Sequence, residues 1–285
     1  MCLDMPTGDG DDLPLLPALA ERGIDARMVA WDEPGVDWSA FDLTVIRATW
    51  NYTLRREDFL AWAASVPRLH NPASVVLPNT DKAYLGALAD AGLPVVPTQL
   101  VPPGTEPKLP EYGEFVLKPS VGAGSRGAGR FDAAKPDAHR QAHEHAERLH
   151  AAGRTVLVQP YLDAVDTAGE TALIYFDGVF SHAIRKGAML EPDVRHRIEA
   201  DALYIEERIS ARQPSAAELA VAERVLHHLH AGLDEPLLYA RIDLLPTSEG
   251  PVLVELELVE PSLFLGYADG AADRLADAVS ARLRR

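Results

Sequence analysis

Apolar residues recur at helical spacing in six segments of the chain. In the first, Leu13, Leu15, Leu16 and Leu19 precede Gly23, a typical helix stop because glycine adopts the left-handed conformation at little cost. The same spacing predicts further helices at Arg56–Ala64, Asp81–Ala91, Pro136–Ala151, Ala216–Ala231 and Ala268–Leu283.

Short apolar runs predict strands, most of them in the middle and the last third of the chain. We expect strands at Ala26–Trp31, Leu43–Arg47, Val95–Val101, Phe115–Lys118, Ala128–Phe131, Thr155–Gln159, Thr171–Phe176, Val179–Arg185, Leu238–Leu245 and Pro251–Leu258. Asp177–Gly178 suits the positive φ angles of a tight hairpin turn, and Thr247–Gly250 joins a second hairpin. The mixture of alternating and strand-rich segments predicts a fold between α/β and α+β.

The N-terminal part has a probable boundary and an unusual start. Asn71–Pro72 and Pro78–Asn79 are turn-forming pairs, so we expect residues 1–78 to form an N-terminal α/β domain. The first twelve residues read as a loop, although an α/β domain normally opens on a buried strand. We therefore expect that strand to be missing from this chain or very short.

Composition narrows the class of protein. Of 285 residues, 47% are apolar and 25% charged, as in ordinary globular enzymes, and the net charge of −16 argues against nucleic-acid and anionic-membrane partners. Cys2 is the only cysteine, which excludes an internal disulfide and favours a reducing compartment. With no signal peptide and no long apolar run, a cytoplasmic location is expected.

The segment G-A-G-S-R-G at 122–127 matches the dinucleotide fingerprint G-x-G-x-x-G literally. That fingerprint requires a helix to begin within it, whereas here more glycine and a short strand follow, so the Rossmann interpretation fails. Walker A also fails, because no Gly-Lys-Ser/Thr is present. What remains is a strand ending at Lys118 and a glycine flap that can turn N–H groups toward an anion.

Three acidic residues in the second predicted hairpin form a candidate metal site. Glu255 and Glu257 are two apart on one strand and point to the same face, and Asp243 on the partner strand can face the same way. Carboxylates in an apolar setting need a cation, and Mg²⁺ prefers oxygen ligands and binds with phosphates. The alternative is a solvated acidic strand face.

Five motifs in order resemble the ATP-grasp superfamily, in its glutathione-synthetase-like branch. They are N-T-D-K at 79–82, F-V-L-K-P with its flap, V-L-V-Q-P-Y-L at 156–162, A-R-I-D-L at 240–244 and V-L-V-E-L-E at 252–257. The resemblance implies an N-terminal substrate-side domain, a small lid and a C-terminal ATP-grasp domain, with ATP between the last two. It divides the chain into 1–78, a linker helix and strand at 79–99, a lid at 100–162 and a C-terminal domain at 163–285.

The resemblance also implies roles for individual residues. Lys82 and Lys118 would contact nucleotide phosphates, the flap would cover them, and Glu170 would meet the ribose. The flap contributes Ser120, Gly122, Gly124 and Ser125, and the adenine would lie against Gln159, Tyr161 and Leu162. Arg185 would contact the transferred phosphoryl group, with Lys186 and Arg241 assisting.

Two positions depart from the family pattern. Glu257 stands where the family usually has asparagine, which puts the metal coordination in doubt. Ala172 stands where some relatives carry an arginine, so that arginine's substrate contact is absent or supplied elsewhere.

The segment R-A-T-W-N-Y at 47–52 follows a predicted strand, at the end where open α/β sheets bind ligands. Arg47 could hold a carboxylate, and Thr49, Asn51 and Tyr52 could hydrogen-bond a small polar substrate. The alternative is that Trp50 and Tyr52 simply pack under the loop.

The function that follows is ATP-dependent joining of a carboxylate and an amine through an acyl phosphate, with ATP and Mg²⁺ as cofactors. W-D-E-P-G-V-D-W, R-A-T-W-N-Y and V-E-L-E-L-V-E-P-S resemble segments of ATP-grasp ligases that form D-cycloserine by cyclising O-ureido-D-serine. An intermolecular amino-acid or peptide ligase is the first alternative, and a nucleotide-binding module without catalysis the second. The expected partner is a small amino-acid substrate, and a homodimer is left open as the assembly.

Overall fold

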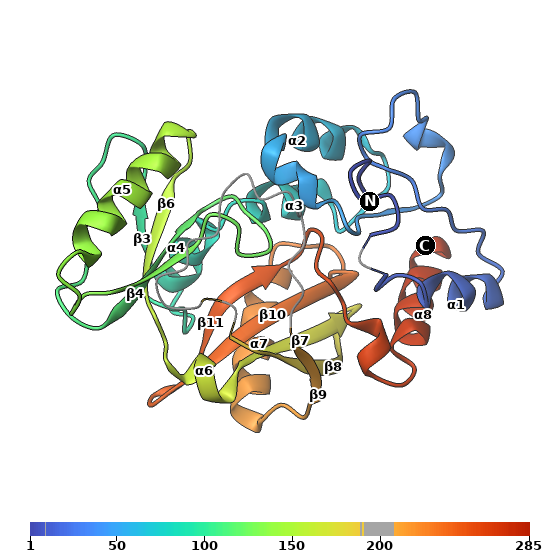
Figure 1. The fold of residues 1–285 in the computed structure, drawn as a ribbon. Helices are drawn as coiled ribbons and strands as arrows, with labels where there is room; N and C mark the ends of the chain where they lie inside the picture. Colours follow the sequence, from blue (N-terminus) through green and yellow to red (C-terminus); the bar gives the residue numbers. More distant parts are fainter. Residues whose placement is uncertain (9, 189, 191–207) are drawn as a thin grey trace.

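The computed structural model describes residues 1–8, 10–188, 190 and 208–285, and it is an α+β fold with three sheets (Figure 1). The central sheet is antiparallel throughout. Its strands are β11 (Gly250–Glu257), β10 (Tyr239–Thr247), β7 (Glu170–Phe176), β8 (Val179–Lys186) and β9 (Ile209–Arg212), in that spatial order.

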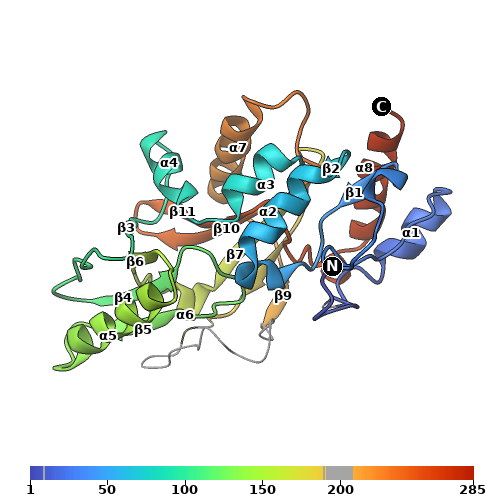
Figure 2. The same cartoon turned by 90° about the horizontal axis from the view of Figure 1, so that it is seen from above.

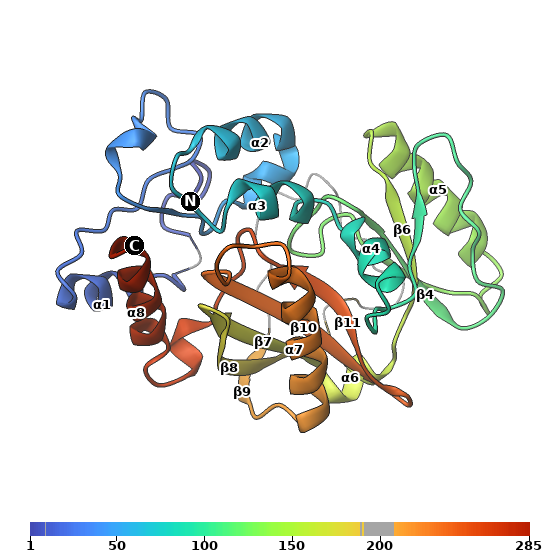
Figure 3. The same ribbon diagram turned by 180° about the vertical axis from the view of Figure 1, so that it is seen from behind.

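Helices cover both faces of the central sheet because β7 is apolar on both sides. Ala172, Ile174 and Phe176 pack in one core cluster with α1 (Leu15–Glu21) and α8 (Ala271–Leu283), whereas Leu173 and Tyr175 pack in another with α4 (Tyr84–Asp90) and α7 (Ala216–His230). Figure 3 shows α7 lying across this second face and α1 beside α8. β7 is therefore a buried central strand.

A second antiparallel sheet lies beside the first (Figure 2). Its order is β3 (Gln99–Val101), β6 (Val156–Pro160), β4 (Glu114–Pro119) and β5 (Gly129–Asp132), and α5 (Ala138–Ala151) packs on it. Ala142, Ala146 and Leu149 on α5 are buried against Phe115 and Leu117. This sheet and helix form a compact unit with its own core.

The N-terminal part is built around a small parallel pair of strands, β1 (Thr44–Val45) and β2 (Leu69–His70), with α2 (Arg56–Ser65) and α3 (Ala73–Asn79). Trp31, Phe59 and Trp62 pack together in its core, with the Phe59 ring centroid 5.3 Å from that of each tryptophan. The buried Asn71 side chain donates to the carbonyls of Tyr239 and Leu258, which fixes this part to the central sheet. The remaining short elements are α6 (Ala164–Ala168), η1 (Trp38–Ala40), η2 (Trp50–Leu54) and η3 (Leu265–Tyr267).

Most predicted elements are confirmed, and three differences have physical causes. No strand forms at 26–31; that segment instead exchanges backbone hydrogen bonds with Met1, through Val29 O and Trp31 N. The strand predicted at Val95–Val101 begins only at Gln99, because the residues before Pro97 pair with β11 instead, where the Val96 N–H donates to the Leu253 carbonyl. β2, β9 and α3 are too short or too polar to give a periodic signal. No helix in the described part of the chain is long and apolar enough to cross a membrane.

Candidate active site

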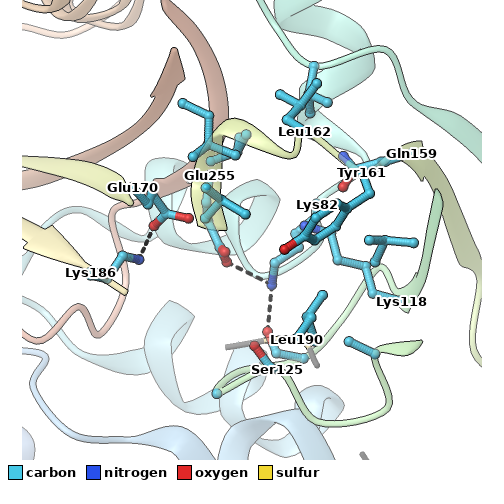
Figure 4. A pocket seen from close by; sticks show the side chains of 18 of the residues that line it. Lys82, Lys118, Ser125, Gln159, Tyr161, Leu162, Glu170, Lys186, Leu190 and Glu255 are labelled. Atoms are coloured by element: carbon cyan, nitrogen blue, oxygen red, sulfur yellow. Dashed lines mark hydrogen bonds and ion pairs between the residues drawn. The ribbon is translucent and has the colours of Figure 1, made fainter. Parts of the chain in front are cut away.

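A cavity with about 1140 Å³ of empty space, part of it open to solvent, lies where the two large sheets meet (Figure 4). Its walls come from β4, β6 and the glycine loop on one side and from β7, β8, β10 and β11 on the other. The structure brings most of the predicted site residues to it: Lys82, Lys118, Gly122, Gly124, Ser125, Gln159, Tyr161, Leu162, Glu170, Lys186, Arg241, Glu255 and Glu257. Ser120, Arg185 and Asp243 do not line it.

The two lysines in the cavity differ in their partners. Lys82 Nζ lies 3.0 Å from Glu255 Oε1 and donates to the Gly122 carbonyl at 2.5 Å. Burial disfavours its charge, but the Glu255 carboxylate outweighs burial, so the pKa of Lys82 is raised. The structure gives Lys118 no hydrogen bond or ion pair with any described residue, and burial lowers its pKa. Lys118 is therefore a cation that an anionic ligand would stabilise.

Acidic side chains crowd the opposite wall. Burial raises the pKa of Glu170 despite the adjacent Lys186, and burial together with Glu255 raises the pKa of Glu257 despite Arg241. This surplus of negative charge is what a divalent cation would relieve, and the donors are oxygens, as Mg²⁺ prefers. No three acidic side chains among the described residues are already gathered around a common point.

The predicted acidic triad is only partly formed. Asp243 lies directly opposite Glu255 in the β10–β11 register, but a bulge follows Asp243 and its side chain is fully buried. Its carboxylate accepts hydrogen bonds from Lys186 Nζ at 2.7 Å and Arg241 Nη2 at 2.9 Å. The prediction that all three carboxylates face a ligand is therefore corrected: Asp243 anchors two cations, and Glu255 and Glu257 line the cavity.

Arg185 is expected to make the main phosphoryl contact, with Lys186 assisting, but the structure favours the opposite assignment. Successive residues of β8 point to opposite faces, and Lys186 is the one that lines the cavity, ion-paired with Glu170 and Asp243. Arg185 donates to the carbonyls of Ala168 and Thr167 instead. The phosphoryl contact expected of Arg185 is thus better suited to Lys186.

A second, smaller cavity of about 650 Å³ adjoins the first and shares Lys82, Arg241, Glu255 and Glu257 with it. Trp50 and Tyr52 from the R-A-T-W-N-Y segment line it. The sequence-predicted substrate residues are therefore divided, since Arg47, Thr49 and Asn51 line neither cavity.

The substrate roles expected of Arg47, Thr49 and Asn51 find no support in this geometry. Arg47 is buried and ion-paired with Asp12 at 2.6 Å and Asp11 at 3.2 Å. Asn51 accepts from Trp31 Nε1 and donates to two aspartates, Asp4 and Asp32. Thr49 is buried too. Arg47 and Asn51 therefore hold the N-terminal segment in place, whereas the buried Thr49 hydroxyl has no hydrogen-bond partner among the described residues.

Comparison with known proteins shows to which family the chain belongs. The family description "D-cycloserine synthetase DcsG, N-terminal domain" matches residues 1–71. The cycloserine biosynthesis protein DcsG of Streptomyces lavendulae is 39% identical over 289 residues, covering 97% of this chain and 95% of that protein. The chain belongs to the DcsG family of ATP-grasp ligases.

Solved structures agree with this assignment. The crystal structure of D-cycloserine synthetase DcsG superposes with a TM-score of 0.86 at 38% identity, over 96% of this chain and 95% of the other. A structure of the ATP-grasp ligase PsnB, which holds Mg and ADP, has a TM-score of 0.60 at 20% identity and covers 97% of both chains. The second likeness shows the shared ATP-grasp fold alone.

Within this DcsG-family site, several residues of the second cavity were not predicted from the sequence, among them Tyr84 and Glu260. Tyr84 O–H is positioned by the backbone of β11, whose Leu256 N–H it accepts. Glu260 is 7% exposed, and burial together with Glu257 raises its pKa to about 8. The signal for Glu260 was an acid inside the apolar run L-V-E-P, three positions after Glu257.

Glu260 should make the stability of the DcsG-family fold depend on pH. Its pKa of about 8 in the fold exceeds the ordinary 4.5, so between these values the native state holds a proton that the unfolded chain has released. Stability should therefore fall as pH rises from 5.5 to 8.5, and Glu260→Gln should remove this component. We expect the variant to gain about 3 kcal/mol relative to wild type over that interval.

Urea unfolding of both proteins at pH 5.5, 7 and 8.5 measures this difference. The other charged and titratable groups that face Glu260 are the same in both proteins, and they are Tyr52, Lys82, Tyr84, Arg241, Glu255 and Glu257. A constant difference between the two proteins at all three pH values would contradict the buried-acid interpretation.

Proposed function

We propose that the protein is an ATP- and Mg²⁺-dependent ligase that activates the carboxylate of O-ureido-D-serine as an acyl phosphate and closes it to D-cycloserine. The observation that carries the nucleotide half of this proposal is Lys118, half-buried without a carboxylate partner among the described residues and facing the acids Glu255 and Glu257 across one cavity. A cation on one wall and a surplus of acids on the other suit a phosphate chain and its metal ion.

The nucleotide would lie along the larger cavity. Gln159 Nε2 already donates to Thr98 Oγ1 at 2.8 Å, which orients its amide so that Oε1 can accept from the adenine amino group. Tyr161 and Leu162 continue the same edge. Glu170 lies where a ribose hydroxyl could reach it, next to Lys186. The flap residues Gly122, Gly124 and Ser125 would offer backbone N–H groups to the phosphates, whereas the Ser120 N–H already donates to the Thr155 carbonyl.

Mg²⁺ would be held by Glu255 and Glu257. Bound there, it would offset the phosphate charge that develops during transfer. Arg241 contacts Glu257 and Asp243, and so holds the proposed metal ligand Glu257 in place while carrying a positive charge at the boundary of both cavities.

The substrate would occupy the smaller cavity. Its carboxylate would approach the γ-phosphate at the shared wall, between Lys82 and Arg241, and displace ADP. The nitrogen bonded to the side-chain oxygen of the same molecule would then attack the acyl carbon, losing a proton and expelling phosphate. Hydrolysis would remove the carbamoyl group from that nitrogen as CO2 and NH3, with one water consumed, to leave D-cycloserine. This pocket is small and polar, lined in part by Tyr52, Tyr84 and Glu260, as a compact amino acid requires. Family membership with DcsG supports the choice of substrate.

Incubation with ATP, Mg²⁺ and O-ureido-D-serine tests the proposal, with ADP, phosphate and the mass of the product as readouts. We expect ADP and the cyclic product without any second amine. ADP that appears only with a second amino acid would replace ring closure by intermolecular ligation. Nucleotide binding without ADP formation, for any amino acid tried, would leave only a binding module.

A substitution of Lys118, which lies on β4 at the base of the glycine flap, tests the proposed nucleotide site. Lys118→Ala should weaken ATP binding and lower kcat/KM about 10²-fold or more, because it removes the cation that faces the phosphates. Calorimetric titration with a non-hydrolysable ATP analogue and Mg²⁺ measures the binding, and Lys135→Ala, on the lid away from the cavity, serves as its control. Unchanged analogue affinity in Lys118→Ala would contradict the nucleotide placement.

A further inference from the structure

The smaller cavity is lined by more acidic than basic side chains. Lys82 and Arg241 are its basic residues, and Glu255, Glu257 and Glu260 its acidic ones, which leaves one more acid than base along its wall. Glu255 is ion-paired with Lys82 and Glu257 with Arg241. Glu260 is the remaining acid, and no ion pair joins it to any described residue.

Glu260 is also enclosed. It is 7% exposed, and its hydrogen-bonding partner is the hydroxyl of Tyr52, which is 4% exposed. The Tyr52 ring packs against Phe59 with centroids 5.0 Å apart, so the hydroxyl is held by the aromatic core of the N-terminal part. A buried carboxylate without a cation is costly for the fold, and such groups commonly serve a ligand.

The position of Glu260 separates it from the nucleotide. It lines the smaller cavity and not the larger one, whereas Glu255 and Glu257 line both. Trp50, Tyr52 and Tyr84 lie along the same wall as Glu260. A carboxylate with no cation of its own suits an ammonium group, which needs one anionic partner, whereas Mg²⁺ requires several oxygen ligands.

We propose that Glu260, positioned by Tyr52, binds the α-ammonium group of the amino-acid substrate. This inference rests on the proposed function. It adds the residue that would distinguish an amino acid from a carboxylic acid without an amino group. The substrate would then span the cavity, with its ammonium at Glu260 and its carboxylate at the wall that Lys82 and Arg241 share with the larger cavity. Fixing both ends of so short a molecule restricts the rotation that ring closure must overcome.

The test compares a substrate with its analogue that lacks only the amino group. The pair is O-ureido-D-serine and 3-(ureidooxy)propanoic acid, each with saturating ATP and Mg²⁺, and the readout is kcat/KM for ADP release. A charged hydrogen bond contributes about 1.5–3 kcal/mol, so wild type should prefer the amine-bearing substrate about 10- to 150-fold. In Glu260→Gln this preference should fall to within about threefold of unity, while affinity for the ATP analogue stays unchanged.

Two further variants separate recognition from folding. Tyr52→Phe should keep part of the preference, because the carboxylate remains but loses its orienting hydroxyl. Glu249→Gln removes an exposed acid from the β10–β11 turn and should behave as wild type. Thermal unfolding with and without the ATP analogue verifies that each variant is folded.

The outcomes distinguish this inference from the function on which it rests. If O-ureido-D-serine gives ADP and Glu260→Gln keeps the wild-type preference, the Glu260 assignment is wrong and the ligase proposal stands. If O-ureido-D-serine gives no ADP, titration of the nucleotide-loaded protein with D-serine and with 3-hydroxypropanoate replaces the rate assay. A preference for D-serine that disappears in Glu260→Gln then supports Glu260 and refutes the proposed substrate. The absence of such a preference in wild type overturns the inference.

Discussion

Glu255→Gln is expected to lower kcat about 10²- to 10³-fold while the protein stays folded. Among the described residues, Glu255 is the acid that both contacts Lys82, at 3.0 Å from its Nζ, and lines both cavities. Gln can still accept the lysine hydrogen bond, so the local geometry should survive. It lacks the negative charge that would hold Mg²⁺ against the phosphates.

Steady-state rates at several Mg²⁺ concentrations measure the effect. The apparent Mg²⁺ requirement should rise in Glu255→Gln, whereas a purely structural role would change stability and leave that requirement alone. Glu223→Gln, an exposed position on α7, is the matched control. Wild-type turnover in Glu255→Gln would remove Glu255 from the proposed metal site.

The order of elements around the nucleotide cavity could be predicted from the sequence because it depends on local signals. The turn at Asp177–Gly178 needs positive φ, and the structure gives φ of 49° and 77° there. Alternation along β11 placed Glu255 and Glu257 on one face, and both line the cavity. These inferences required only neighbouring residues on one strand or hairpin.

The sequence does not predict which of two adjacent side chains on a strand faces the cavity when that depends on the neighbouring strands. Both Arg185 and Lys186 are basic and adjacent, and alternation says only that they point to opposite sides. Lys186 faces the cavity because β7 presents Glu170 on that side and β10 presents Asp243. Neither neighbour is close in the sequence, so the pattern carried no information about it.

The same limit explains Arg47. A cation after a strand fits a ligand site and a buried ion pair equally well, and its partners Asp11 and Asp12 come from a segment that read as loop. That segment also contacts the chain near the second cavity, since Asp11 accepts from the backbone N–H groups of Leu263 and Leu265. Glu260 could not be predicted for a different reason. A single acid in an apolar run forms no repeated pattern that would indicate a site.

Asp243→Asn is expected to destabilise the protein by about 3–5 kcal/mol, because it breaks a buried charge network rather than an exposed pair. The carboxylate is fully buried, between Lys186 at 2.7 Å and Arg241 at 2.9 Å. Burial alone would raise the pKa of Asp243, but Arg241 and Lys186 outweigh it and lower the pKa to about 2. Asparagine preserves the shape and leaves two buried cations facing each other without the negative charge between them.

Urea unfolding at pH 7 distinguishes this anchoring role from the metal-ligand role that the sequence alone suggested for Asp243. If Asp243 anchors, Asp243→Asn should lower the unfolding midpoint in the absence of nucleotide and metal, and added Mg²⁺ should not restore it. If Asp243 were instead a metal ligand, the metal-free proteins would unfold alike and differ only when Mg²⁺ and nucleotide are present. Asp243 holds both Lys186 and Arg241, and both of these side chains line the cavity. The anchoring role therefore also predicts that kcat falls in the folded fraction of the variant.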